Sequence, residues 1–400
     1  MCPTMHNRAT ESIADDVPGL RILSVFHRCI GYSFFSWTKR DERHVVSCET
    51  KTPYLLYALC SWVVYLFVMG QDAYCVLHAT NSCRPLRNID KVVLFLYFTR
   101  CIGIQLVNAS TILFSSPRIL KMMRAVYNYQ RKLDSSTRLR RSAFVIVLLN
   151  ILFSVAAVVA VAGDIIEFQG YMSSLYLKII YGVYSFLFVE TTCMVCFSWV
   201  MYFSKLFHEF LRQRNQEIDS LLRAPDVELR RLEEMHMKQC YLYESFQECN
   251  AIFHVPLLIG VPLCIMNATP WAYYLLIASN NFERLRDAIG FAAMLAEMLV
   301  LGLYARAADT EAKKTWQVLT KLLVSHEHPP EVRHQIEQFR HTCQNQDFTF
   351  SGCGFFTVGP PLIVSIASAI ITYTVILYQS DSTASAALSS ASGSNNATGM

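Results

Sequence analysis

The stretch Ala143–Gly163, AFVIVLLNILFSVAAVVAVAG, contains no charged residue over its whole length. A helix needs about 20 predominantly apolar residues to cross a bilayer core that is ~30 Å thick. This stretch therefore predicts a membrane-spanning helix rather than the buried helix of a soluble protein. The composition agrees, because hydrophobic residues make up 53% of the chain and charged residues only 16%, whereas soluble domains have about 25% charged residues.

Six further apolar segments place this span in an all-α, polytopic membrane protein with seven transmembrane helices. Residues 1–30 mix charges with short apolar patches and lack the unbroken apolar core of a signal peptide. The first span is therefore expected to act as its own insertion signal. The predicted spans are 53–70, 91–115, 143–163, 174–203, 251–279, 288–306 and 354–378.

Lysine and arginine residues predict the orientation of these spans. Cytoplasmic segments of membrane proteins carry the excess of positive charge. The counts are 27 in segments 1–52, 116–142, 204–250 and 307–353, and 4 in segments 71–90, 164–173, 280–287 and 379–400. We therefore expect a cytoplasmic amino terminus and an extracellular carboxyl terminus, the reverse of a G-protein-coupled receptor.

The segments then follow one another in a defined order. Spans one to four occupy 53–203, and spans five and six occupy 251–306. The remaining segments are a cytoplasmic amino-terminal segment 1–52, two cytoplasmic helical segments 204–250 and 307–353, the seventh span 354–378 and a flexible extracellular tail 379–400. The tail contains the glycosylation sequon Asn396-Ala-Thr398, which is useful only in an extracellular segment; a chance match is the alternative.

The two long cytoplasmic segments have apolar residues at helical spacing. In 204–250 a first helix is interrupted by Pro225, and a second begins near Val227 and continues into the fifth span. In 307–353 the interruption is Pro329-Pro330. The stripes are Leu206, Phe207, Phe210, Leu211, Ile218, Leu221 and Leu222, then Leu229, Leu232, Met235 and Leu242, then Trp316, Leu319, Leu322 and Leu323, and finally Val332, Ile336 and Phe339. These helices either lie on the membrane surface or bundle together below it.

The end of the chain resembles the seventh-span signature of insect gustatory receptors. The stretch 350–379 reads FSGCGFFTVGPPLIVSIASAIITYTVILYQ, and the signature is Thr-Tyr, five hydrophobic residues and Gln-Phe. Thr372, Tyr373 and Gln379 match it, whereas Ser380 replaces the final Phe. Residues 308–323, ADTEAKKTWQVLTKLL, also look like the family's helix between the sixth and seventh spans. This family is similar to the insect odorant receptors.

The resemblance implies a homo- or heterotetrameric, ligand-gated cation channel in the plasma membrane of sensory neurons. The seventh spans of four subunits would line one pore, and a small-molecule tastant would bind in the outer half of the other spans. Thr372, Ile376 and Gln379 share one helical face, with Tyr373, Ile376 and Ser380 on a neighbouring stripe. An apolar ring at Ile376 or Leu377 would close the pore by dewetting. Alternatively, Gln379 only marks the water interface and Tyr373 packs in a helix contact.

Ionisable residues at membrane depth are candidates for the ligand pocket, because they are costly unless they face a cavity or a partner. Three such residues are Arg100, Glu190 and Glu297. They either form a buried ion pair that stabilises the bundle or line a pocket for a sugar or a bitter compound. Nearby aromatic and amide candidates are Tyr97, Tyr181, Tyr184, Asn267, Trp271 and Tyr274.

Other functions have little support in the sequence. There is no phosphate-binding glycine loop, nucleophile elbow or pair of carboxylates in an aqueous cleft, so no catalytic residue, no cofactor and no nucleic-acid partner are expected. The histidines between His326 and His341 lack zinc-site spacing, so no metal is expected. Cys75 and Cys83 could form a disulfide in the first outer segment. The main alternative to a channel is a secondary transporter that uses Arg100, Glu190 and Glu297.

Overall fold

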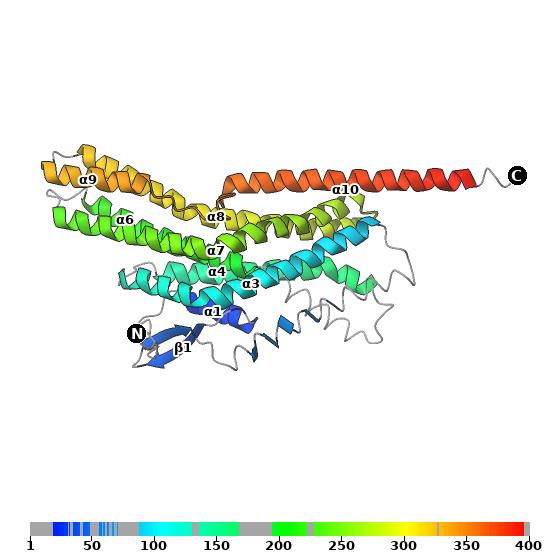
Figure 1. Ribbon diagram of the computed structural model, residues 1–400, viewed down its shortest axis with the longest axis horizontal. Coiled ribbons are helices and arrows are strands. Elements are labelled where there is room, and N and C mark those ends of the chain that lie inside the picture. The colour runs from blue at the N-terminus through cyan, green and yellow to red at the C-terminus, as the bar shows by residue number, and fades with distance from the viewer. Residues whose placement is uncertain are drawn as a thin grey trace, which may run out of the picture.

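The computed structural model describes a long helical bundle (Figure 1). It describes residues 19–30, 32, 35–40, 43–48, parts of 56–70, 88–129, 136–167, 194–221, 228–325 and 328–395. The helices are α1 (Leu20–Cys29), α3 (Asn88–Tyr129), α4 (Ser136–Glu167), α6 (Val195–Leu221), α7 (Leu229–Ile277), α8 (Asn281–Ser325), α9 (Pro330–Gln344) and α10 (Pro360–Asn395).

One β-hairpin departs from the all-α prediction. Strand β1 (Phe35–Arg40) pairs antiparallel with β2 (Arg43–Cys48), so that Phe35 lies opposite Cys48. The strand residues include Trp37, Thr38, Val45 and Val46, types that favour extended backbone. The hairpin lies within the predicted amino-terminal segment, for which the sequence analysis assigned no structure.

Within the part of the chain that the structure describes, four helices are long and apolar enough to cross a membrane. The stretches are Thr137–Ala156, Leu229–Ile277, Asn281–Val324 and Pro360–Thr383, and they coincide with the predicted third, fifth, sixth and seventh spans. The predicted second span lies within α3. Half of the predicted first span and most of the predicted fourth span lie outside the described residues, so the total of seven remains a prediction.

Helices α7 and α8 run well beyond the predicted fifth and sixth spans. Helix α7 has 49 residues and α8 has 45. The prediction that a helix starting near Val227 continues into the fifth span is confirmed, since α7 is unbroken from Leu229 to Ile277. It remains helical through Pro256, Pro262 and Pro270.

The main hydrophobic core lies where α4, α6, α7 and α8 meet. Aromatic side chains of α6 form its centre: Trp199 stacks on Phe203 at a centroid distance of 5.8 Å, and Phe203 lies 5.7 Å from Phe253 of α7. One turn further on, Phe207 meets Phe246 edge-on at 5.2 Å. Each of these aromatic rings is almost fully buried.

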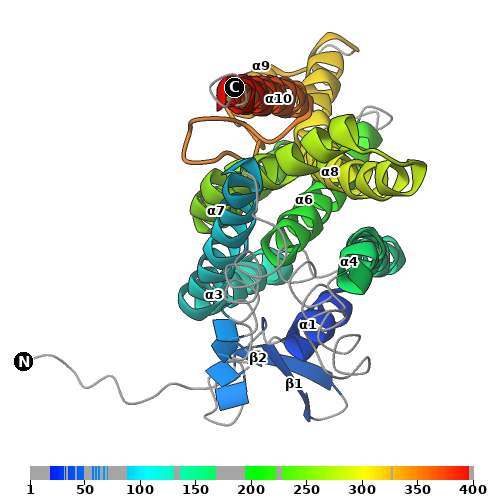
Figure 2. The ribbon, with the colours of Figure 1, turned by 90° about the vertical axis from the view of Figure 1, so that its right-hand side faces the viewer.

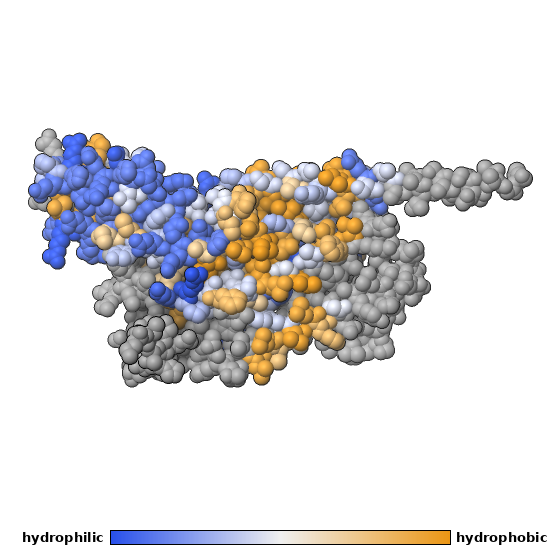
Figure 3. All heavy atoms as spheres, in the orientation of Figure 1, coloured by the Kyte–Doolittle hydropathy of each residue, from blue (hydrophilic) through white to orange (hydrophobic). Residues whose placement is uncertain are grey.

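A second, separate core joins the far ends of α6, α7 and α8 to α9. We call this region the distal bundle. All members of its core are buried: Ile218, Leu221, Leu232, Met235, Leu319, Leu322, Val332, Ile336, Phe339 and Cys343. The predicted apolar stripes therefore pack on one another, which favours the bundle over helices lying on the membrane surface. Figure 3 shows a hydrophilic surface over this end and a hydrophobic band over the middle of the molecule.

The seventh predicted span differs from the structure at both ends. It was expected to begin at residue 354, but a tight loop holds 350–359, where Val358 N donates to Phe350 O at 2.7 Å, and α10 begins at Pro360. Proline favours the first turn of a helix because it needs no intrahelical N–H bond there. The tail from 379 was expected to be flexible, yet α10 continues to Asn395. Alanine at four positions between 384 and 391 favours this extension.

Candidate functional site

Helix α10 packs against the bundle along one face only. Ile366, Ile370 and Thr374, spaced four residues apart, are buried against α7 and α8. Of the residues in the most apolar stretch of α10, only 17% are buried within the chain, compared with 50% in the corresponding stretch of α7. Figure 2 shows α10 at the edge of the molecule beside these helices, far from α1 and the hairpin. Most of the surface of α10 is therefore not covered by other parts of the same chain.

The face of α10 opposite this packing carries a polar stripe. Its hydroxyls bond to their own backbone: Ser365 Oγ donates to Pro361 O at 3.1 Å, and Thr372 Oγ1 donates to Ser368 O at 2.9 Å. Each hydroxyl oxygen still has a lone pair that can accept a hydrogen bond or contact a cation. The exposed stripe consists of Ser365, Ser368, Thr372, Ile376, Gln379 and Thr383.

The predicted gate residues other than Leu377 lie on or beside this stripe. The side chain of Ile376 is 49% exposed and that of Tyr373 is 55% exposed, so Tyr373 is not packed within its own chain. Ser380 is exposed, and its hydroxyl donates to Ile376 O at 2.8 Å. Leu377 is half-buried, toward the packing face. Of the two proposed barrier residues, Ile376 is the one on the stripe.

Just beyond Ser380, α10 makes a polar contact between two residues that are not among the predicted site residues. Tyr273 of α7 is fully buried, and its hydroxyl donates to Asp381 Oδ2 at 2.8 Å. Asp381 lies in the predicted extracellular tail, and Tyr273 is not among the predicted site residues. A carboxylate directly after an apolar span was the available signal.

Two of the predicted pocket residues meet deep in the bundle, and a third is buried nearby in the sequence of α8. Arg100 of α3 and Asn267 of α7 both point to the sulfur of Met294 on α8, at 3.9 and 3.0 Å. Glu297 lies one turn further along α8 and is buried, as are Arg100 and Asn267. Met294 had no sequence signal, because a methionine in an apolar span is usual.

Trp271 borders this cluster on α7, one turn after Asn267. Its ring lies so close to Gly290 of α8 that a Cβ added there would stand 2.8 Å from the ring. The contact between α7 and α8 therefore requires glycine at this position. Tyr274, half-buried, packs beside Tyr273 with 5.4 Å between ring centroids.

The other predicted site residues are not placed. Tyr181, Tyr184, Glu190, Cys75, Cys83 and Asn396 lie outside the described residues, and only the backbone of Tyr97 is described. Among the residues that the structure describes, no three histidine, cysteine, aspartate or glutamate side chains form a group that could hold a metal ion.

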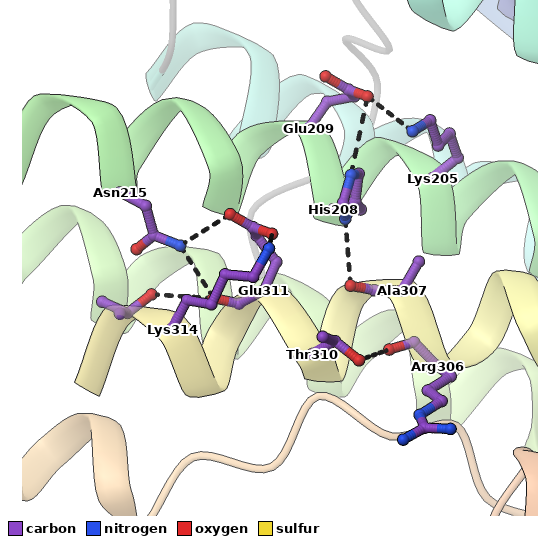
Figure 4. Close-up of polar contacts among 10 residues, drawn as sticks. Lys205, His208, Glu209, Asn215, Arg306, Ala307, Thr310, Glu311 and Lys314 are labelled. Carbon is purple, nitrogen blue, oxygen red and sulfur yellow. Dashed lines mark hydrogen bonds and ion pairs between the residues drawn. The ribbon is translucent and has the colours of Figure 1, made fainter. Parts of the chain in front are cut away.

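A polar network joins α6 to α8 near the distal bundle (Figure 4). Asn215 Nδ2 donates to Glu311 O at 2.9 Å and to Glu311 Oε1 at 3.1 Å, and Lys314 Nζ bonds the other carboxylate oxygen at 2.8 Å. These bonds satisfy a glutamate that is almost fully buried, which fixes the register of α6 on α8.

His208 lies in the same interface. Its Nδ1 contacts Ala307 O of α8 at 3.1 Å, so this nitrogen carries the proton and donates. The side chain of Glu209, which is almost fully buried, is held by Lys205 Nζ at 2.7 Å. Burial lowers the pKa of His208 below its ordinary value of 6.5, despite the opposing bond to Ala307. His208 is therefore neutral at physiological pH.

Comparison with known proteins finds similarity to a family model and to solved structures. A family model described as 7tm Chemosensory receptor matches residues 20–384. The solved structure of the insect olfactory receptor OR5 from Machilis hrabei superposes with a TM-score of 0.67 at 14% identity. Its complex with eugenol gives a TM-score of 0.66 at the same identity. Each alignment covers 90% of this chain and 97% of the receptor. No curated protein sequence matches.

Proposed function

The chain belongs to the 7tm chemosensory receptor family, and from this premise we propose that it is a gustatory receptor that acts as a ligand-gated, non-selective cation channel. The family is one of receptors rather than enzymes. Four copies, identical or mixed with related subunits, would surround one pore. A small-molecule tastant, a sugar or a bitter compound, would open it.

The polar stripe on α10 carries this proposal. In lipid, a face containing Ser365, Thr372 and Gln379 would leave hydroxyl and amide groups without water. Four α10 helices that turn these stripes toward a common axis instead give them water and passing cations. Hydroxyl and amide oxygens can then replace part of an ion's hydration shell.

Ile376 is the proposed closed gate. It is the apolar side chain within the stripe, with Thr372 on one side and Gln379 on the other. Four isoleucines at one level would form an apolar ring that water leaves, which stops ions without a mechanical plug. The family signature has a bulky Phe at position 380. Here the residue is the small, polar Ser380, so no second apolar ring lies beside that of Ile376.

Truncation of the gate tests this proposal. In cells expressing Ile376→Ala, we expect a larger current without ligand, because a wider and less apolar ring stays wet. Whole-cell recording measures this current, and Ile371→Ala, which is also exposed on α10 but lies off the stripe, is the matched control. An unchanged leak in Ile376→Ala would remove Ile376 from the gate.

The proposed topology has seven spans, a cytoplasmic amino terminus and an extracellular carboxyl terminus, in the plasma membrane of sensory neurons. The charge distribution of the sequence supports it, and the distal bundle would then lie in the cytosol. In unpermeabilised cells, antibody should stain an epitope tag at the carboxyl terminus and not one at the amino terminus. The reverse staining would contradict this topology and favour a G-protein-coupled receptor.

The cluster of buried Arg100, Asn267 and Glu297 with partly buried Trp271 is the proposed edge of the ligand pocket. Its guanidinium, amide and carboxylate groups suit a ligand with several hydrogen-bonding groups, and its indole suits stacking. Tyr97, Tyr181, Tyr184 and Glu190 remain further candidates. The solved relative with eugenol bound supports a small-molecule ligand for this fold.

A secondary transporter is the second candidate, because buried ionisable groups such as Arg100 and Glu297 are typical of coupling sites. The two functions differ in rate. Single-channel current steps would support a channel, whereas slow, saturable uptake without such steps would support a transporter.

A further inference from the structure

We propose that the hydrogen bond from Tyr273 to Asp381 is a latch, which holds the outer part of α10 against α7 and must open when the pore opens. The proposal rests on the channel function proposed above. It assigns two positioning residues, one on each helix, that set how readily the gate opens without themselves lining the pore.

The latch joins the packing face of α10 to the interior of the bundle. Asp381 follows Ile370 and Thr374 at steps of eleven and seven residues, so all three share one face of the helix. The Tyr273 hydroxyl donates to Asp381 Oδ2 at 2.8 Å, and the tyrosine is fully buried. A hydrogen bond to a charged acceptor is about twice as strong as a neutral one. It therefore contributes strongly to holding this end of α10.

Thr374, on the same face, opposes the latch. Its side chain is buried, and Oγ1 has no hydrogen-bond partner. Thr372 and Ser380, on exposed faces, bond their hydroxyls to their own backbone. A buried hydroxyl without a partner disfavours the packed arrangement. Rotation of α10 away from α7 would bring Thr374 to water. Hydration of its hydroxyl would then offset part of the free energy lost when the latch bond breaks.

Helix α7 connects the latch to the proposed ligand pocket. Asn267 and Trp271 lie within two turns of Tyr273 on the same helix, and the Trp271 ring leaves no free space at Gly290 of α8. A ligand that shifts α8 against α7 at this contact also moves Tyr273. The latch is thus placed where binding in the bundle can be transmitted to α10.

Currents without ligand test the latch. Tyr273→Phe keeps the ring and removes the hydroxyl, and Asp381→Ala removes the acceptor. We expect each variant to shift the opening equilibrium about tenfold toward open, and the double variant to go no further than either single one, because the two residues act as one unit. Asp381→Asn keeps an acceptor oxygen but loses its charge, so its opening equilibrium should lie between those of Asp381→Ala and the unmodified channel.

Two controls separate the latch from other effects. Ser382→Ala, next to Asp381, removes an exposed hydroxyl that bonds only within α10 at 2.9 Å, and its leak should not change. If Asp381 acted instead as a charge at the pore mouth, Asp381→Asn would lower single-channel conductance and Tyr273→Phe would leave gating unchanged. That pattern would overturn the latch.

A labelling experiment tests the same geometry without relying on conduction. A cysteine at the buried position (Thr374→Cys) should react with a water-soluble thiol reagent about tenfold faster when Tyr273→Phe is also present. Thr372→Cys, on the exposed stripe, should react at the same rate with or without it. Rates are measured on surface protein and corrected for the native cysteines. Equal rates for Thr374→Cys in both backgrounds would overturn the latch.

The outcomes distinguish the latch from the channel function. If Ile376→Ala conducts but Tyr273→Phe and Asp381→Ala leave the leak and the labelling unchanged, the latch is wrong and the channel stands. If no variant conducts, Ile376→Ala included, the channel function is wrong, and the gating role of the latch fails with it.

Discussion

The distal bundle and α10 are both helical and rich in apolar side chains, yet they bury their surfaces in different ways. In the distal bundle, Ile218, Leu232, Leu319 and Phe339 come from four helices and meet in a core that a single chain completes. Helix α10 buries one stripe against α7 and α8 and leaves most of its length uncovered.

The difference shows which surfaces a single chain buries by itself and which surfaces it leaves exposed to its surroundings. A closed core is stabilised by removing apolar surface from water. An uncovered helix with a polar stripe gains most of its contacts from lipid, water and further subunits. Substitutions in the distal bundle should therefore act on stability, and those on the exposed part of α10 on function.

The largest expected effect is at the centre of the distal bundle. Phe339→Ala removes a fully buried ring, and deletions of this kind cost about 3–5 kcal/mol. The matched variant Ile371→Ala truncates a side chain that is 65% exposed and should change stability little. Thermal unfolding of the purified protein measures both. Equal losses of melting temperature would contradict the claim that the distal bundle stabilises the chain more than the exposed part of α10 does.

A smaller loss is expected in the network that joins α6 to α8. Asn215→Ala removes both bonds from its amide to Glu311 and should cost about 1–3 kcal/mol, because the carboxylate stays buried. Thr310→Ala is the control, since this exposed hydroxyl bonds only to Arg306 O of its own helix. The same unfolding assay applies, and a similar melting temperature for the two variants would show that Asn215 does not fix the register.

The smallest expected effect is a pH dependence at His208. Its pKa is lowered by burial, so the folded chain binds this proton less readily than the unfolded chain. The stability contribution is complete above pH 6.5 and declines as the pH falls from there through the lowered pKa. His208→Gln should flatten this part of the melting-temperature profile. The charged groups that act on the ring are Lys205, Glu209 and Glu311. An unchanged slope in His208→Gln would show that His208 does not cause the dependence.

Sequence periodicity predicted which residues share one face of each helix. Apolar residues three and four apart, such as Leu319 and Leu322, define a stripe whatever its partner is, and they are buried as expected. The same rule placed Thr372, Ile376 and Gln379 on one face, which is exposed. The family resemblance of the last span supplied the interpretation of that face and is confirmed by the family match.

Contacts between distant segments could not be predicted in this way. Arg100 and Asn267 converge on Met294 only because α3, α7 and α8 cross at that level. The bond from Tyr273 to Asp381 likewise depends on how α10 packs, and no local pattern encodes it. The ends of α10 were misjudged because hydropathy marks the apolar part of a helix, whereas Pro360 and the alanines of the tail determine where the helix itself begins and ends.

The uninterrupted length of α7 and α8 has a mechanical consequence. At 1.5 Å per residue, 49 and 45 residues give rods of roughly 70 Å, more than twice the ~30 Å of a bilayer core. A rod of this length that rocks by about 5° around its middle carries its two tips about 3 Å in opposite directions. Each helix therefore acts as a lever. A change of packing at one tip can move the other tip and so change how strongly a ligand is bound there.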